Sequence, residues 1–116
     1  DRNLRTKYFN GSINYPVLFT FDLSDGPKRA RNYTIVSAND MPGRDPKSWE
    51  LFGSLDGKKW TKLDKRIDED FTTRYQARTF AIAGNDQSFK YYRLQINASS
   101  INRSGVQFSE FGLEFD

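Results

Sequence analysis

The chain has 116 residues, of which 36% are hydrophobic, and its 18 basic and 15 acidic side chains give a net charge of +3. This length suits one domain with a single core, and no apolar run reaches the roughly 18 residues of a membrane-spanning helix. Cys and His do not occur in the sequence, which excludes thiolate and imidazole catalysis, disulfides, and zinc sites with nitrogen or sulfur ligands.

The basic residues are interspersed with acids, and only 28–31 and 58–59 form dense basic spots. A nucleic-acid-binding domain usually has a larger, clustered excess, because each phosphate contact releases counterions. The sequence therefore argues against a nucleic-acid partner. Its loops carry few bulky apolar residues, which also argues against docking on a membrane.

The first predicted strands are 17–23 and 32–37. In 17–23 the apolar residues alternate on one face, and the turn 24–27 follows. Residues 32–37 are short and β-branched, which is typical of a strand buried on both sides. Both segments favour a β-sheet protein.

The next two predicted strands, 48–54 and 60–63, flank the pair Asp56-Gly57. Glycine accepts the positive φ that a tight hairpin turn requires, so this pair is predicted to join two antiparallel strands. Trp49 and Trp60 are expected in the core, because aromatic residues dominate core burial. Residues 64–73 show no apolar period and are predicted to form a long loop.

Alternation resumes in 78–83 and 91–96, and it changes phase within 106–115. Val106 and Phe108 share one face of this last strand, whereas Phe111 and the apolar residues after it have the opposite parity. A bulge or a switch between sheets near Ser109-Glu110 would reconcile the two halves.

These patterns predict an all-β fold, since no segment offers a good amphipathic helix. A sandwich is favoured over a closed barrel because long polar loops separate the strands, and such loops gather at the ends of a two-sheet scaffold. The loops concerned are 37–47, 64–77 and 97–105.

Several segments resemble a known family. They are DRNLRTKY (1–8), FDL (21–23), DPKSWELFGSLDGKKWTKL (45–63), YYRL (91–94) and QFSEF (107–111). Over nearly its whole length the chain is similar to the coagulation-factor type C, or discoidin-like, domain. The resemblance implies a galactose-binding-domain-like jelly-roll β-sandwich over 1–116. It also implies that this domain is trimmed at its N-terminus and is part of a larger protein.

The resemblance further implies a non-catalytic carbohydrate-binding or adhesion module. Its partners would be a glycan ligand and the other domains of a secreted, periplasmic or cell-surface protein, such as a glycoside hydrolase, which it tethers to glycans. One alternative is a structural or protein-interaction module with the same fold. A carboxylate hydrolase using Asp68 and Asp70 ranks last, because two acids in one loop do not face each other across a cleft of about 5 to 10 Å.

Structural calcium is also implied by the resemblance, held by the loop matching 1–6 and by a Glu of the last strand. The residues concerned are Asp1, Asn3, Thr6 and Glu110. Their oxygens suit a hard cation, and a cation would compensate a carboxylate at a position that otherwise requires an apolar residue. Alternatively, the bulge turns Glu110 to solvent or towards an Arg such as Arg93, and Asp1 is a frayed end.

A sugar site requires an aromatic ring and planar polar groups that make paired hydrogen bonds to hydroxyls. Two loops, 39–44 and 71–75, supply these groups, and the predicted ligand-binding residues are Asn39, Asp40, Arg44, Arg74 and Tyr75. The alternative is that Arg44 and Arg74 pair with surface acids in 68–70, and that Asp45 only forms a turn before Pro46.

Overall fold

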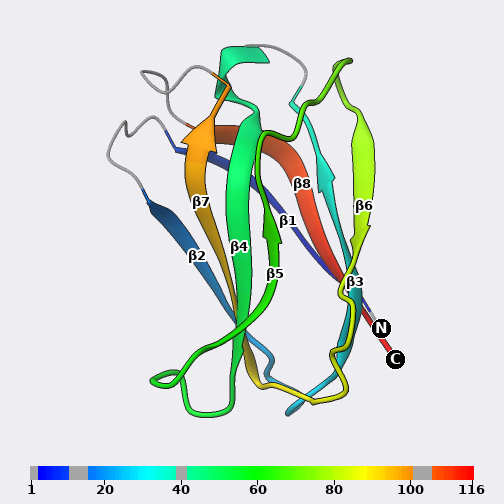
Figure 1. Ribbon diagram of the computed structural model, residues 1–116. Coiled ribbons are helices and arrows are strands. Elements are labelled where there is room, and N and C mark those ends of the chain that lie inside the picture. The colour runs from blue at the N-terminus through cyan, green and yellow to red at the C-terminus, as the bar shows by residue number, and fades with distance from the viewer. Residues whose placement is uncertain (1–2, 11–15, 39–41, 101–105) are drawn as a thin grey trace.

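The computed structural model describes residues 3–10, 16–38, 42–100 and 106–116, with the backbone alone for 3–10 and 42. Two antiparallel four-stranded sheets pack face to face (Figure 1). Sheet A has the order β1 (Asn3–Asn10), β8 (Val106–Phe115), β3 (Ala30–Val36) and β6 (Ala77–Ala81); sheet B has the order β2 (Val17–Asp22), β7 (Tyr91–Ser99), β4 (Pro46–Ser54) and β5 (Thr61–Arg66).

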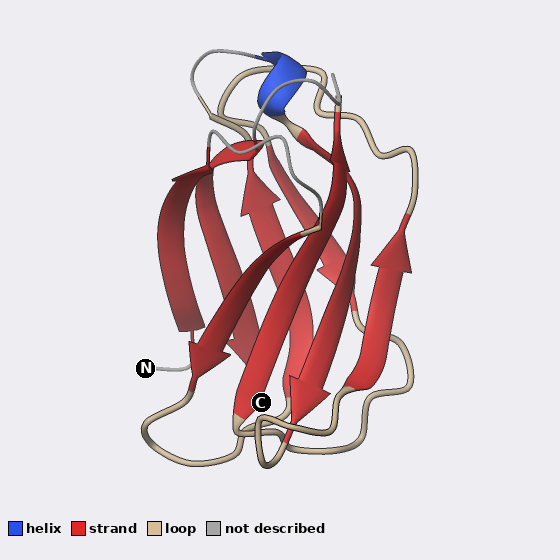
Figure 2. Ribbon diagram, turned by 90° about the vertical axis from the view of Figure 1, so that its left-hand side faces the viewer, coloured by secondary structure: helices blue, strands red, loops and turns tan. Residues whose placement is uncertain are grey.

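The predicted all-β sandwich is confirmed, and each strand predicted from alternation is present. Two elements were not predicted: β1, and a single 3-10 turn, η1 (Pro42–Arg44) (Figure 2). Residues 3–10 form a strand where a loop was expected, because β8 provides a partner edge that local sequence does not reveal. Strand β5 extends to Arg66, beyond its predicted end at Leu63, so the loop that follows is shorter.

The core lies between the sheets, and a hydrogen-bonded chain crosses it. Trp49 on β4 is fully buried, and its indole nitrogen donates to the hydroxyl of Tyr33 on β3 at 2.8 Å. That hydroxyl donates in turn to Asp64 on β5 at 2.5 Å. Burial, together with this bond to Asp64, raises the pKa of Tyr33 well above its usual range. The chain fixes the two sheets to each other through a buried phenol.

Trp60 is not a core residue, contrary to expectation. It is half-buried, and the guanidinium of Arg93 lies 4.1 Å from its ring centroid. Arg93 also donates to the Thr20 hydroxyl at 3.0 Å, so this group covers the outer face of sheet B. Trp60 lies between the turn and the start of β5 at Thr61, and its ring lies outside the core. Arg93 lies on β7 in sheet B, whereas Glu110 lies on β8 in sheet A.

The predicted bulge in β8 is confirmed. Thr6 pairs with Phe111 and Tyr8 pairs with Phe108, so Ser109 and Glu110 together oppose a single residue of β1. Phe108 and Phe111 are consequently both buried, at 1% and 0% exposure. The extra residue lets both halves of β8 face the core and leaves Ser109 and Glu110 only half-buried.

Strand β3 is buried on one face only, although burial on both was expected. Tyr33 and Ile35 are fully buried, whereas Asn32, Thr34 and Val36 are half-buried on the outer face of sheet A. The antiparallel neighbours β6 and β8 cover the edges of β3 but not its outer face. This face of sheet A is therefore available to other molecules.

Candidate functional site

Strands β3, β5 and β7, which precede the three predicted polar loops, all end at the same end of the sandwich (Figure 1). We call this the loop end. The segments 23–29, 55–60 and 82–90 join strands at the opposite, turn end, and include the predicted hairpin at Asp56-Gly57, where Gly57 has φ of 77°. The longest segment between strands, 67–76, lies at the loop end, so this is where the site is sought.

The loop between β5 and β6 is anchored from within. The Phe71 ring is buried at 4% exposure and packs 6.5 Å from Trp49, measured between ring centroids. The Ser37 hydroxyl donates to the carbonyl of Thr73 at 2.9 Å and accepts from the Gln76 amide at 2.9 Å. These contacts hold residues 71–76 against the end of β3.

Arg74 and Asp45 form a bidentate ion pair beneath this loop. The two guanidinium nitrogens lie 2.9 and 2.5 Å from the two Asp45 carboxylate oxygens. The Asp45 side chain is only 3% exposed, and Arg74 also donates to the carbonyl of Ala38 at 3.3 Å. This geometry is the strong, planar form of the interaction. Arg74 is therefore committed to the protein.

Tyr75 lies directly after this clamp in an unusual backbone conformation. Its φ is 53°, a left-handed value that costs a non-glycine residue about 1–2 kcal/mol. Its side chain is nonetheless 61% exposed. Burial of the ring thus does not account for the strain, and the conformation presents an aromatic face at the surface.

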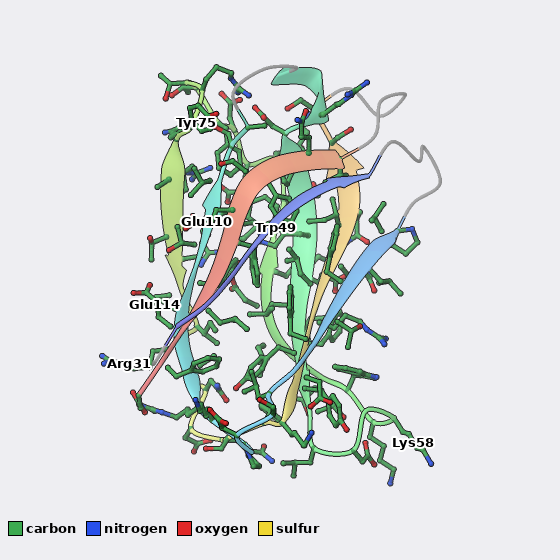
Figure 3. All side chains as sticks on the ribbon, turned by 180° about the vertical axis from the view of Figure 1, so that it is seen from behind. Arg31, Trp49, Lys58, Tyr75, Glu110 and Glu114 are labelled. Carbon is green, nitrogen blue, oxygen red and sulfur yellow. The ribbon has the colours of Figure 1, made fainter. Side chains whose placement is uncertain are left out.

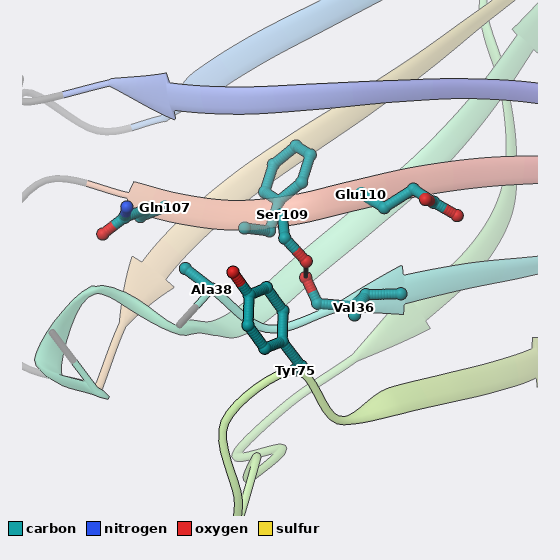
Figure 4. Close-up of a pocket in the computed structure, with 7 residues that line it drawn as sticks. Val36, Ala38, Tyr75, Gln107, Ser109 and Glu110 are labelled. Carbon is teal, nitrogen blue, oxygen red and sulfur yellow. Dashed lines mark hydrogen bonds between the residues drawn. The ribbon is translucent and has the colours of Figure 1, made fainter. Parts of the chain in front are cut away.

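A pocket of about 390 Å³ opens beside Tyr75 (Figure 4). It lies where β8 and β3 reach the loop end, and it is lined by Val36, Ala38, Tyr75, Gln107, Phe108, Ser109 and Glu110. The volume falls within the range of small-ligand sites, about 300–1,000 Å³. We call it the tyrosine pocket.

The polar groups of the tyrosine pocket come from the β8 bulge and its neighbours. The Ser109 hydroxyl donates towards the carbonyls of Val36 and Ser37, at 3.2 and 2.9 Å, and so fixes the bulge to β3. Gln107 lines the pocket and has a buried Oε1 without a hydrogen-bond partner among the described residues, and Glu110 lines it with a half-buried side chain. An aromatic face beside an amide and a carboxylate can bind a polyhydroxylated ring.

Of the predicted ligand-binding residues that the structure describes, only Tyr75 lines the tyrosine pocket. Arg74 instead holds Asp45, a partner that the surface-acid alternative did not include. Arg44 ends η1 and is half-buried. Asn39 and Asp40 lie outside the described residues. Gln107, Ser109 and Glu110 were missed as ligand-binding residues; alternation with Val106 and Phe108 pointed to the outward position of Gln107 and Ser109, whereas Glu110 was expected on the inward face.

The predicted calcium ligands are gathered only in part. The β1 register places Thr6 opposite Phe111, beside Glu110, but it places Asn3 opposite Glu114, three residues or about 10 Å along the strand. Asp1 lies outside the described residues. Within the described part of the chain, no group of three or more His, Cys, Asp or Glu residues could hold a metal. Calcium at these residues stays a prediction.

Solved structures of low sequence identity share this fold. An F5/8 type C domain from Bacteroides fragilis has a TM-score of 0.73 at 17% identity, covering 93% of this chain and 72% of that one. CBM32-3 from a family 31 glycoside hydrolase of Clostridium perfringens has a TM-score of 0.71 at 11% identity, covering 98% and 75%. The chain has the discoidin-like jelly-roll fold. The resemblance inferred from sequence is thus confirmed at the level of the fold.

Another similar structure contains a sugar. CpGH89CBM32-5 from Clostridium perfringens was solved in complex with GalNAc-β-1,3-galactose; its TM-score is 0.67 at 16% identity, covering 96% of this chain and 73% of that one. No family model matches the sequence. A peptide-N(4)-(N-acetyl-β-glucosaminyl)asparagine amidase of Arabidopsis thaliana is 47% identical over 51 residues, which are 43% of this chain and 7% of the amidase.

The match thus spans a small fraction of the amidase, and the chain shares a segment with it rather than its whole architecture. Among the described residues, no helix has the length and apolar character needed to cross a bilayer.

Proposed function

We propose that the chain is a non-catalytic carbohydrate-binding module in which the Tyr75 ring covers one face of a sugar and Gln107 and Glu110 bind its hydroxyls. One observation carries this proposal: a strained, exposed tyrosine lines the tyrosine pocket, on a loop fixed by a buried ion pair. Strain at a rigid, exposed position favours a functional role over a structural one.

The fold supports the same proposal. Structures with this fold include modules solved with GalNAc-β-1,3-galactose and with 4,5-unsaturated mannuronic acid. The Arabidopsis amidase is named for its action on N-acetylglucosaminyl-asparagine, so glycans with that linkage should be included on the array. The module would tether a larger secreted, periplasmic or cell-surface protein to such glycans and raise their local concentration.

The acids of the loop end do not support a hydrolase. Asp68 and Asp70 are both exposed, and Asp68 lies 3.9 Å from the ammonium of Lys47. Hydrolysis by a carboxylate pair requires two acids that face each other across a cleft of about 5 to 10 Å, and two exposed acids of one loop do not form such a cleft. We therefore assign the module a binding role.

A glycan array followed by calorimetry tests the proposal. Tyr75→Ala should weaken binding at least tenfold, or about 1.4 kcal/mol. Ile67→Ala is a matched control, because Ile67 lies on the same loop and is 60% exposed, against 61% for Tyr75. Equal affinities of the two variants would overturn the site. A silent array combined with a measurable protein partner would favour the protein-interaction alternative.

We also propose that Thr6 and Glu110, which the register of β1 and β8 brings near each other, contribute to a calcium site. A bound ion stabilises the folded state by about 2.7 kcal/mol when its concentration is 100 times its dissociation constant. Calcium should then raise the melting temperature by several degrees relative to EDTA, and Glu110→Gln should remove this difference, whereas Glu114→Gln should not. Identical melting with calcium and with EDTA would end this proposal without affecting the sugar site.

A further inference from the structure

A second pocket lies on sheet A at the turn end. It has a volume of about 470 Å³ and is lined by Arg29, Arg31, Asn32, Ile82, Gly84, Asn85 and Asp86. We call it the polar pocket. Asn32 lies on the outer face of β3, the face that contributes Val36 to the tyrosine pocket. The two pockets therefore lie at opposite ends of one sheet face.

Hydrogen bonds within the protein fix one side of the polar pocket. The Asn85 amide donates to the carbonyl of Ala30 at 3.1 Å and its Oδ1 accepts from the backbone of Gln87 at 3.2 Å. Arg29 donates to the carbonyl of Asn85 at 3.1 Å and pairs with Asp116. These bonds fix the loop 84–87 against β3. The side chains of Asn85 and Arg29 are therefore already engaged in contacts within the protein.

Other polar groups of this pocket retain hydrogen-bonding capacity. The Asn32 carboxamide is half-buried and makes no hydrogen bond to the described residues. Arg31 contacts Asp116 through its Nε at 3.1 Å, and its side chain is 62% exposed. Asp86 is exposed. A carboxamide, a guanidinium and a carboxylate are planar groups that can bind adjacent hydroxyls in pairs.

Between the two pockets, β3 and β6 carry short side chains, and Glu114 of β8 lies at the register position opposite Asn32. On β3 the outward residues are Asn32, Thr34 and Val36, and their register partners on β6 are Ala81, Thr79 and Ala77. The Thr34 and Thr79 hydroxyls are hydrogen-bonded at 2.7 Å. Figure 3 shows Tyr75, Glu110, Glu114 and Arg31 following one another down this side of the molecule. Asn32 and Val36 are four positions apart along the strand, or about 13 Å.

The charges of the polar pocket offset one another. Arg29 and Arg31 are balanced by Asp86 and by Asp116, which contacts both guanidiniums. The tyrosine pocket contributes the carboxylate of Glu110. The Glu110 carboxylate would repel a uronate in the tyrosine pocket, and the polar pocket has no net positive charge that would attract one. The arrangement favours a neutral, hydroxyl-rich ligand.

We propose that the polar pocket is a second subsite for the same ligand, so that the protein binds a neutral oligosaccharide along sheet A rather than one terminal sugar. This inference rests on the proposed function of the tyrosine pocket. Asn32 and Arg31 bind the distal rings, and Tyr75 stacks on the first one. A chain that bridges both pockets gains the second contact at a high effective concentration.

Calorimetry with N-acetylglucosamine and with galactose, each as a mono-, di-, tri- and tetrasaccharide, tests this inference. Wild-type affinity should rise at least fivefold between the shortest and the longest member of the series that binds. Arg31→Ala and Asn32→Ala should each remove most of that rise and leave the affinity for the monosaccharide unchanged. Tyr75→Ala should weaken binding at every length.

Lys58→Ala is the matched control for Arg31→Ala, because it removes an exposed positive charge at the turn end outside the polar pocket. Melting curves identify a variant that fails to fold, and Arg31 is exposed enough to be replaced safely. Affinity independent of chain length, or equal effects of Arg31→Ala at every length, would overturn the second subsite while the tyrosine pocket stands. No binding of either series by the wild type would overturn both.

Discussion

The two ends of the sandwich reverse the chain in physically different ways. At the turn end, the described residues with positive φ are glycines: Gly26, Gly57 and Gly84. At the loop end they are Asp68 and Tyr75. Glycine adopts this conformation without steric cost, whereas other residues lose about 1–2 kcal/mol. Backbone strain is therefore confined, among the described residues, to the end that carries the tyrosine pocket.

Among the described ion pairs, the one with the least exposed acid lies at the loop end, although exposed pairs such as Lys47 with Asp68 occur there too. The loop end holds the buried, bidentate pair of Arg74 with Asp45. The turn end has exposed pairs, such as Lys28 with Asp25 at 3.8 Å and Arg31 with Asp116 at 3.1 Å. Buried interactions stiffen the loop end enough to maintain the strain at Tyr75. The comparison teaches that rigidity and strain occur together where a ligand is expected.

The largest expected effect is the loss of the buried pair. Arg74→Met should lower the free energy of unfolding by about 3–5 kcal/mol, because it leaves the Asp45 carboxylate buried without its counter-ion. Arg31→Met, which removes an exposed pair, should cost less than about 1 kcal/mol. Urea denaturation measures both. Equal costs for the two variants would remove the distinction between the two ends.

A smaller effect is expected at the hairpin of the turn end. A Cβ at Gly53 would lie 2.5 Å from the ring of Phe89, which is only 3% exposed. Gly53→Ala should therefore destabilise the fold by about 1–3 kcal/mol through overpacking. Adding Phe89→Leu should recover part of this loss, and thermal melting of the single and double variants tests it. Strictly additive effects would show that the two residues do not compete for space.

The strain at Tyr75 predicts a smaller difference in stability, in which glycine is the more stabilising replacement rather than alanine. Tyr75→Gly should be more stable than Tyr75→Ala by about 1 kcal/mol, because glycine relieves the left-handed conformation. At Ile67, on the same loop but without positive φ, glycine should instead be the less stable of the two. Both Tyr75 variants should lose sugar binding. If alanine is the better residue at both positions, Tyr75 is unstrained.

The smallest expected effect is a pH dependence at the turn end. Backbone amides of Lys59 and Lys58 donate to the Asp56 carboxylate and lower its pKa from 3.8 to about 2. Its contribution to stability is therefore present above pH 3.8 and is lost as the pH falls through about 2. Melting temperatures of wild type and Asp56→Asn should converge over this interval. Parallel profiles would contradict the role of Asp56.

The architecture was largely predictable, because alternation of apolar residues reports directly which side of a strand meets the core. The phase change in β8 even located the bulge at Ser109-Glu110. Trp60 was misplaced because hydrophobicity does not tell an inner face from an outer face on which an arginine can stack. Strand β1 was missed since its pairing partner, β8, lies at the far end of the sequence.

The site was less predictable than the fold. Composition identified Tyr75 as an aromatic residue in a polar loop, and the structure places it on a pocket. It did not show that Arg74 is committed to Asp45, because that contact joins residues 29 positions apart across two loops. The other polar residues of the pocket come from a strand, where sequence patterns are interpreted as packing rather than as binding.

The bulge in β8 has a consequence for how this protein can change. Because Phe108 and Phe111 are three positions apart, deleting Ser109 or Glu110 would restore strict alternation and keep all five apolar residues of β8 on the buried face. The deletion would instead remove one of the two residues that together oppose a single residue of β1, and with it a polar position that borders the tyrosine pocket. The alignment of the core therefore does not require the extra residue, whereas the lining of the tyrosine pocket does.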